Sequence, residues 1–138
     1  MNRSKSGLFL IELIIAVGFF ALASAVCIQL FAAAHSLRTR SFGLQMAVVS
    51  AQSAAESFKA TGANAHRMGE LLGGDLTGTR LTLGYDENWV PVRAQTARYL
   101  MVVEIDTSEE PALAAIIVED TAMDELLYSL TAKSYLGL

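Results

Sequence analysis

The sequence predicts an α+β protein: a long N-terminal α-helix, with a first half apolar enough to span a membrane, packed on a small antiparallel β-sheet. Three observations support this fold class. An apolar run extends from Leu8 to Ala34, a helical apolar stripe continues as far as Phe58, and segments rich in β-forming residues follow from Thr79. The length of 138 residues favours a single domain.

Composition excludes several classes of protein. The chain is 53% hydrophobic and 17% charged, with a mean hydropathy of +0.41, which is unlike a disordered protein. The 14 acidic and 10 basic residues give a net charge of −4, so no direct nucleic-acid binding is expected. A single cysteine allows no internal disulfide and no cysteine-based zinc site.

The apolar run over residues 8–34 is long enough for a transmembrane helix, which needs roughly 20 mostly apolar residues. Basic residues lie on both sides of this run. Arg3 and Lys5 precede it, and Arg38 and Arg40 follow it. Because the two sides carry similar positive charge, charge alone does not determine the orientation of the helix.

Glu12 is the one charged residue in this run. A carboxylate inside a membrane helix costs about 2.5–3.5 kcal/mol on insertion scales. Two explanations are open: Glu12 lies near the membrane surface, where the cost falls, or a partner charge compensates it. If the chain is cut after Gly7, the new α-amine of Leu8 lies four residues from Glu12, and a helix N-terminus favours nearby negative charge.

The N-terminus resembles the type IV pilin and type II secretion pseudopilin family. The resemblance rests on a short basic leader ending in glycine and followed by LFLIELIIAV, with the matching residues Arg3, Lys5, Gly7, Leu8, Ile11, Glu12 and Leu13. It implies that a membrane aspartyl prepilin peptidase cuts between Gly7 and Leu8 and N-methylates Leu8. It also implies that Glu12 pairs with the N-terminal amine of a neighbouring subunit and so directs filament assembly.

Two residues depart from the family pattern. Leu8 stands where phenylalanine or methionine is commoner, which weakens the expectation of methylation. Gln29 stands where many major pilins have a helix-kinking proline, so we expect a straighter helix, as in a pseudopilin or minor pilin.

The resemblance implies a division of the chain and a set of partners. Residues 1–7 would be the leader, 8–34 the transmembrane and filament-core helix, 35–61 its amphipathic second half, and 62–138 a pilin-like head. The implied partners are other pilin or pseudopilin subunits, the prepilin peptidase, an inner-membrane assembly platform and membrane lipid, with no cofactor. The subunit would cross the cytoplasmic membrane once, with its head outside the cytoplasm, before it joins a surface or periplasm-spanning filament.

The alternative is an anchored or secreted binding domain unrelated to pili. The basic start, the apolar run and the small residues ALASA also fit a secretory signal peptide ending at Ala25. A lipoprotein signal at Cys27 fits less well, because Val26 is large. Glu12 interrupts the apolar core that a signal peptide needs, so we favour the prepilin interpretation.

Beyond Ala34 the helical periodicity continues. The expected apolar stripe consists of Leu37, Leu44, Val48, Ala51, Ala55 and Phe58. Gly62 is a natural helix stop, so the sequence predicts one helix from about Leu8 to Thr61. The stripe requires a surface to cover it.

That surface is the predicted sheet. After a Gly-rich connector with a short helical turn at His66 to Leu72, five β-rich runs follow: Thr79–Asp86, Asn88–Val92, Thr96–Asp106, Leu113–Asp120 and Glu125–Leu136. Short loops between them favour an antiparallel meander, and Pro91 confines the second run to an edge or a bulge. The expected inward rows are Tyr99, Met101, Val103 and Ile105 in the third run, and Leu126, Tyr128, Leu130 and Ala132 in the fifth.

No catalytic residues are predicted, and we expect no enzyme. His35 and His66 have no metal-ligand spacing, and the Gly-rich connector lacks the lysine of a phosphate-binding loop. The C-terminal carboxylates are expected to form a solvated rim, with calcium binding between loops left open, although no loop has a recognisable ligand order: Glu104, Asp106, Glu109, Glu110, Glu119, Asp120, Asp124 and Glu125. Trp89 and Cys27 are expected to be packing residues.

Overall fold

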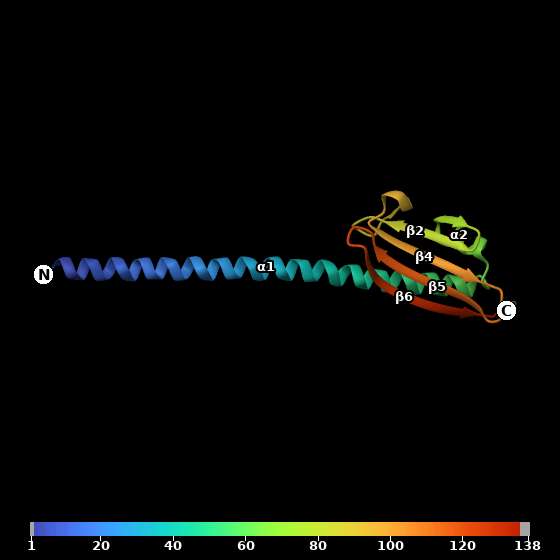
Figure 1. Ribbon diagram of the computed structural model, residues 1–138, viewed down its shortest axis with the longest axis horizontal. Coiled ribbons are helices and arrows are strands. Elements are labelled where there is room, and N and C mark those ends of the chain that lie inside the picture. Colours follow the sequence, from blue (N-terminus) through green and yellow to red (C-terminus); the bar gives the residue numbers. More distant parts are fainter. Residues whose placement is uncertain (1, 136–138) are drawn as a thin grey trace. The chain divides into compact units, whose positions relative to one another are not determined.

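The computed structural model describes residues 2–135, with side chains from residue 4 onward. It confirms the predicted α+β class: a long N-terminal helix followed by a small antiparallel sheet (Figure 1). The chain divides into two compact units, residues 1–41 and residues 42–138. The first helix, α1 (Asn2–Ala60), contributes to both units.

The first unit is helical throughout its described part. Helix α1 begins at Asn2 rather than at the predicted Leu8, so the basic leader also adopts helical geometry. The C-terminal end of α1 agrees with the prediction. Gly62 has a left-handed φ of +60°, and the N–H of Ala63 donates to the carbonyl of Phe58 at 3.0 Å. Gly62 therefore ends the helix as expected, because glycine adopts this conformation without a steric penalty.

The second unit is built on a six-stranded sheet with every neighbouring pair antiparallel. Its main path runs β1-β2-β4-β5-β6, which confirms the meander. The strands are β1 (Asp75–Thr77), β2 (Arg80–Tyr85), β3 (Pro91–Val92), β4 (Tyr99–Asp106), β5 (Ala112–Asp120) and β6 (Glu125–Ser134). Helix α2 (Ala65–Leu72) precedes the sheet, and the 3-10 turn η1 (Ala94–Thr96) precedes β4.

All five predicted strands are present. Four of them are shorter than predicted, and β5 begins one residue earlier, at Ala112. Strand β3 pairs only with the end of β2, so Pro91 lies at the sheet edge as predicted. Strand β1 was not predicted, because it lies in the Gly-rich connector and has three residues. The predicted end of the last strand, Leu136, lies outside the described residues.

One hydrophobic core joins the second half of α1 to the sheet. Its largest fully buried side chains are Phe58, Met68, Leu81, Met101, Val103, Ile116 and Val118. The predicted inward row of β4, from Tyr99 to Ile105, is confirmed in full. In Figure 1 the C-terminal part of α1 passes across the sheet, and its buried side chains share one core with those of β2, β4 and β5.

The buried stripe of α1 differs from the predicted one. Leu37 is 72% exposed and Leu44 is 38% exposed, while Ala51, Ala55 and Phe58 are buried as expected. The face that meets the sheet begins instead with two small residues, Gly43 and Ala47. A Cβ at position 43 would lie 3.5 Å from the hydroxyl oxygen of Tyr99, so a larger side chain there would hold the helix away from the sheet.

The predicted row of β6 is wrong at its first residue. Leu126 is 58% exposed. A β-bulge causes this: Val118 pairs with Tyr128, but Glu119 pairs with Leu126, which leaves Leu127 as an extra residue. The extra residue reverses the alternation, so that Leu127 packs against the core in place of Leu126.

Three aromatic rings pack at the end of the sheet where β2 stops and β4 starts. Trp89 is 6% exposed and stacks on Tyr99 with ring centroids 4.4 Å apart, and Tyr85 lies 5.4 Å from Trp89 on the same measure. Asp86 holds the intervening turn, because its Oδ1 accepts hydrogen bonds from the N–H groups of Asn88 and Val90. Trp89 is therefore a packing residue, as predicted.

Candidate functional site: the apolar N-terminal helix

The sequence-predicted site residues all lie on α1, in the first unit. Leu8 is 68% exposed, Glu12 is exposed and Gly7 is half-buried. Residues four apart in an α-helix lie on the same face. The structure therefore places Leu8 and Glu12 together, one helical turn apart.

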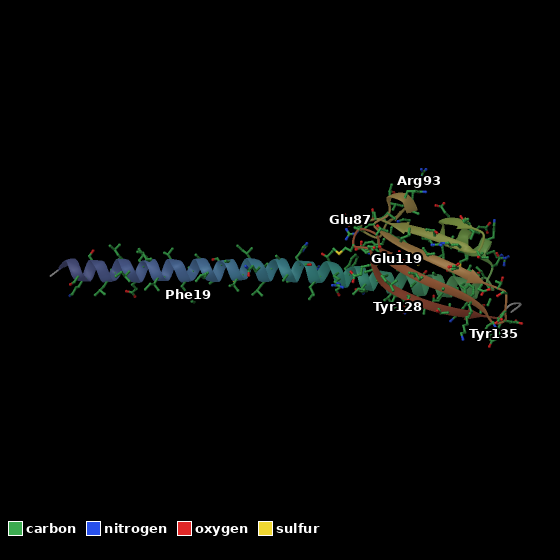
Figure 2. The ribbon with its side chains drawn as sticks, viewed as in Figure 1. Phe19, Glu87, Arg93, Glu119, Tyr128 and Tyr135 are labelled. Carbon is green, nitrogen blue, oxygen red and sulfur yellow. The ribbon has the colours of Figure 1, made fainter. Side chains whose placement is uncertain are left out.

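The side chains around this site are apolar and uncovered. Every residue from Leu8 to Ala34 is exposed, including Phe19 at 73%, Phe20 at 75% and Phe31 at 77%. Figure 2 shows Phe19 projecting outward from the helix. The most apolar part of α1 has a mean hydropathy of 2.5, and none of it is buried. By length and composition this helix could cross a membrane, and an N-terminal signal sequence would meet the same criteria. The core helix of a soluble protein, in contrast, would be mostly buried.

One face of this apolar helix carries small residues. Gly18, Ala21 and Ala25 recur at intervals of three and four. A Cβ built at Gly18 would meet no atom within 4 Å, so no described residue fills the space beside it. Small residues at this spacing let two helices approach closely, in a filament core or in a membrane dimer.

Glu12 has no compensating charge on its own helix turn. The apolar run contains no basic residue, and the structure gives Glu12 no ion-pair partner within the described part of the chain. A carboxylate in an apolar environment requires a positive partner or protonation. If the apolar helix is covered by lipid or by other helices, Glu12 is therefore either protonated or paired with a positive group from outside the apolar run.

Among its described residues, the head contains no candidate metal site. No three His, Cys, Asp or Glu side chains in the described part of the chain come together as metal ligands. The Nδ1 atom of His66 lies 3.4 Å from a carboxylate oxygen of Glu70, and both side chains are exposed. An open hollow of ≈ 620 Å³ beside β4 and β5 is lined by Glu104, Asp106 and three threonines, among other residues.

The carboxylates are only partly the solvated rim that was predicted. Glu87 and Glu119 lie at one end of the sheet, and Tyr135 at the other (Figure 2). Two of the carboxylates depart from this prediction: Glu125 is half-buried, and Asp120 is 6% exposed and paired with Arg98. The hydrogen bond from Arg98 lowers the pKa of Asp120 and, in return, raises the pKa of Arg98.

Sequence reasoning missed this ion pair because Arg98 and Asp120 are 22 residues apart. The strand register provides the signal. Tyr99 pairs with Asp120 across β4 and β5, so Arg98, immediately before Tyr99, lies beside Asp120. Only the register, which the sequence left open, identifies these two residues as neighbours.

Comparison with known proteins found no relative of this chain. The chain matches no protein-family model, no curated protein and no solved structure.

Proposed function

We propose that this chain is a structural subunit, a minor pilin or pseudopilin, of a type IV pilus or a type II secretion pseudopilus. The observation that carries the proposal is the lone carboxylate of Glu12 in an uncovered apolar helix, five residues after Gly7. The head adds support. Its helix packs on an antiparallel meander, which is the arrangement that resemblance to this family implies.

The proposed mechanism begins with removal of residues 1–7. Cleavage after Gly7 removes Arg3 and Lys5 and creates a positively charged α-amine on Leu8. Glu12 of one subunit then pairs with the amine of Leu8 in a neighbouring subunit. In a low-dielectric filament core this attraction is strong, and leaving either charge unpaired is costly, so correctly staggered neighbours are favoured. Packing between the apolar helices supplies the rest of the assembly energy.

The first test is the N-terminus of the full chain extracted from membranes of cells with an active prepilin peptidase. The proposal expects Leu8 as the first residue, and a methyl group on its amine would strengthen it. Cells without the peptidase serve as the control and should retain residues 1–7. A first residue of Val26 would instead identify a signal peptide, and an uncut chain would identify an ordinary membrane anchor. Either result contradicts the proposal.

The second test separates insertion from assembly. Glu12→Ala and Glu12→Gln should insert and be cut normally but give much less filament, measured as the amount sheared from cells or as cross-linked oligomers. Gln29→Ala is the matched control, because it also removes a polar side chain from the same helix. A Glu12→Ala variant that assembles as well as the control would show that Glu12 has no role in assembly.

A further inference from the structure

The bond that the proposed function requires to be cut lies inside a helix. Helix α1 begins at Asn2 and continues without interruption through Gly7 and Leu8. The carbonyl of a helical residue accepts a hydrogen bond from the N–H four residues later. The Gly7–Leu8 peptide group therefore takes part in the hydrogen-bonded turns of the helix.

Resting on the proposed function, we infer that the peptidase cuts the Gly7–Leu8 bond only after the start of α1 has opened, and that residues 2–7 form a marginal helix that opens readily. In the cleavage, the oxygen of a water attacks the carbonyl carbon of Gly7 and the C–N bond to Leu8 breaks. Gly7 leaves as a carboxylate and Leu8 as a protonated amine. An aspartyl peptidase, which supplies the two carboxyl groups that move these protons, must reach both the carbonyl and the departing nitrogen.

Gly7 has no steric reason to be glycine in this structure. A Cβ built at this position meets no atom within 4 Å, and Gly7 is absent from the residues with a positive φ. What glycine changes here is helix stability, because it favours the helix about fivefold less than alanine does. Gly7 therefore weakens the helix at the bond to be cut.

The rest of the leader weakens the helix in the same way. Serines at positions 4 and 6 are mediocre helix formers, and no acidic residue lies in the first turn. Lys5 places a positive charge near the helix N-terminus, where the helix dipole already has its positive end. From Leu8 onward, the leucines at positions 8, 10 and 13 are better helix formers than glycine or serine, whereas isoleucine ranks with serine. The weakest helix former in this part of the chain, Gly7, thus lies directly at the bond to be cut.

The test compares cleavage rates of the full chain in detergent micelles with purified prepilin peptidase. Ser6→Ala and Ser6→Gly alter helix stability in opposite directions without altering charge, and so do Ser4→Ala and Ser4→Gly. Within each pair the glycine variant should be cut faster, by up to about fivefold at Ser6 and by less at Ser4, which lies in the first turn of α1. Amide hydrogen exchange at residues 6–10 should change in the same order. Ser24→Ala and Ser24→Gly are the matched control pair, because they make the same changes in α1 away from the leader and should leave the rate unchanged.

The outcomes distinguish this inference from the proposed function. Equal cleavage rates within both serine pairs, together with exchange rates that differ, overturn the inference and leave the proposed function intact. Cleavage rates that follow the exchange rates across both pairs support it. An unmodified chain that the peptidase does not cut at all overturns the proposed function itself.

Discussion

Arg98 and Asp120 form a bidentate ion pair that joins the start of β4 to the end of β5. The Nε atom of Arg98 donates to Oδ1 of Asp120 at 2.9 Å, and Nη2 donates to Oδ2 at 3.1 Å. The N–H of Ala122 also donates to Oδ1, at 3.0 Å. Both oxygens of a nearly buried carboxylate are thereby satisfied, which fixes the turn between β5 and β6.

Removing either partner should destabilise the head. We expect Arg98→Ala or Asp120→Ala to lower the free energy of unfolding by about 1–3 kcal/mol, because each leaves polar groups of the other side unpaired. The double variant should lose less than the sum of the two single variants. Urea unfolding of the full chain in a nonionic detergent, followed by fluorescence of the single tryptophan, measures this. Glu119→Ala, next to the pair but exposed, is the control and should change stability by less than about 0.5 kcal/mol.

The same ion pair predicts a loss of stability in acid. The hydrogen bond from Arg98 is the largest cause that lowers the pKa of Asp120 in the folded chain, whereas the unfolded value is about 3.9. A lowered pKa stabilises the folded state fully above the unfolded pKa, and this stabilisation is lost as pH falls through the folded pKa. Unfolding midpoints measured from pH 6 to pH 2 should therefore decline below about pH 4. Asp120→Asn should flatten this decline, and an unchanged slope would contradict the assignment.

Phe58 should dominate the attachment of α1 to the sheet. Its side chain is fully buried, so Phe58→Ala should lower the free energy of unfolding by about 3–5 kcal/mol, and Phe58→Asp should separate helix and sheet. Val49 lies on the same helix but is 52% exposed, so Val49→Ala should have little effect. Limited proteolysis of the sheet in detergent-solubilised protein measures the difference. Equal resistance of the Phe58 and Val49 variants would contradict the observed packing.

Two glycines in the head make opposite predictions for the same substitution. A Cβ at Gly84 would lie 2.8 Å from the Cβ of Ala97 and 2.9 Å from the carbonyl oxygen of Val92, so Gly84→Ala should cost about 1–3 kcal/mol. Gly69 lies inside α2, where a Cβ would be 3.6 Å from the nearest atom. Gly69→Ala should therefore be neutral or stabilise the head by up to about 1 kcal/mol. Thermal unfolding of the two variants, recorded side by side, distinguishes the signs.

The sequence predicted the fold class well because the strongest patterns are local. The apolar run from Leu8 to Ala34, the stop at Gly62 and the alternation around Tyr99 to Ile105 each report on neighbouring residues along the chain. The sequence predicted the details that depend on packing less well. The exposure of Leu44 and the burial of Ala47 follow from how closely the helix approaches the sheet, which periodicity alone does not determine.

The same distinction between local patterns and contacts that depend on packing applies to the predicted site. The spacing of Gly7, Leu8 and Glu12 and the family resemblance predict their roles, which stay predictions, and the structure adds that the three residues share a helix which begins at Asn2. The sequence could not identify the Arg98–Asp120 pair, because that contact depends on the register of two strands. It also could not place the bulge at Leu127, where one inserted residue reverses the alternation of the flanking segment.

The bulge at Leu127 also lies on the strand that could pair with a sheet from another molecule. Strand β6 is an end strand of the sheet's main path, so its outer backbone groups are open to a strand from another molecule. The inserted residue interrupts the regular ladder near one end of β6, and the exposed charge of Lys133 lies near the other. Both features oppose edge-to-edge aggregation, so many heads can be crowded together while each sheet stays separate.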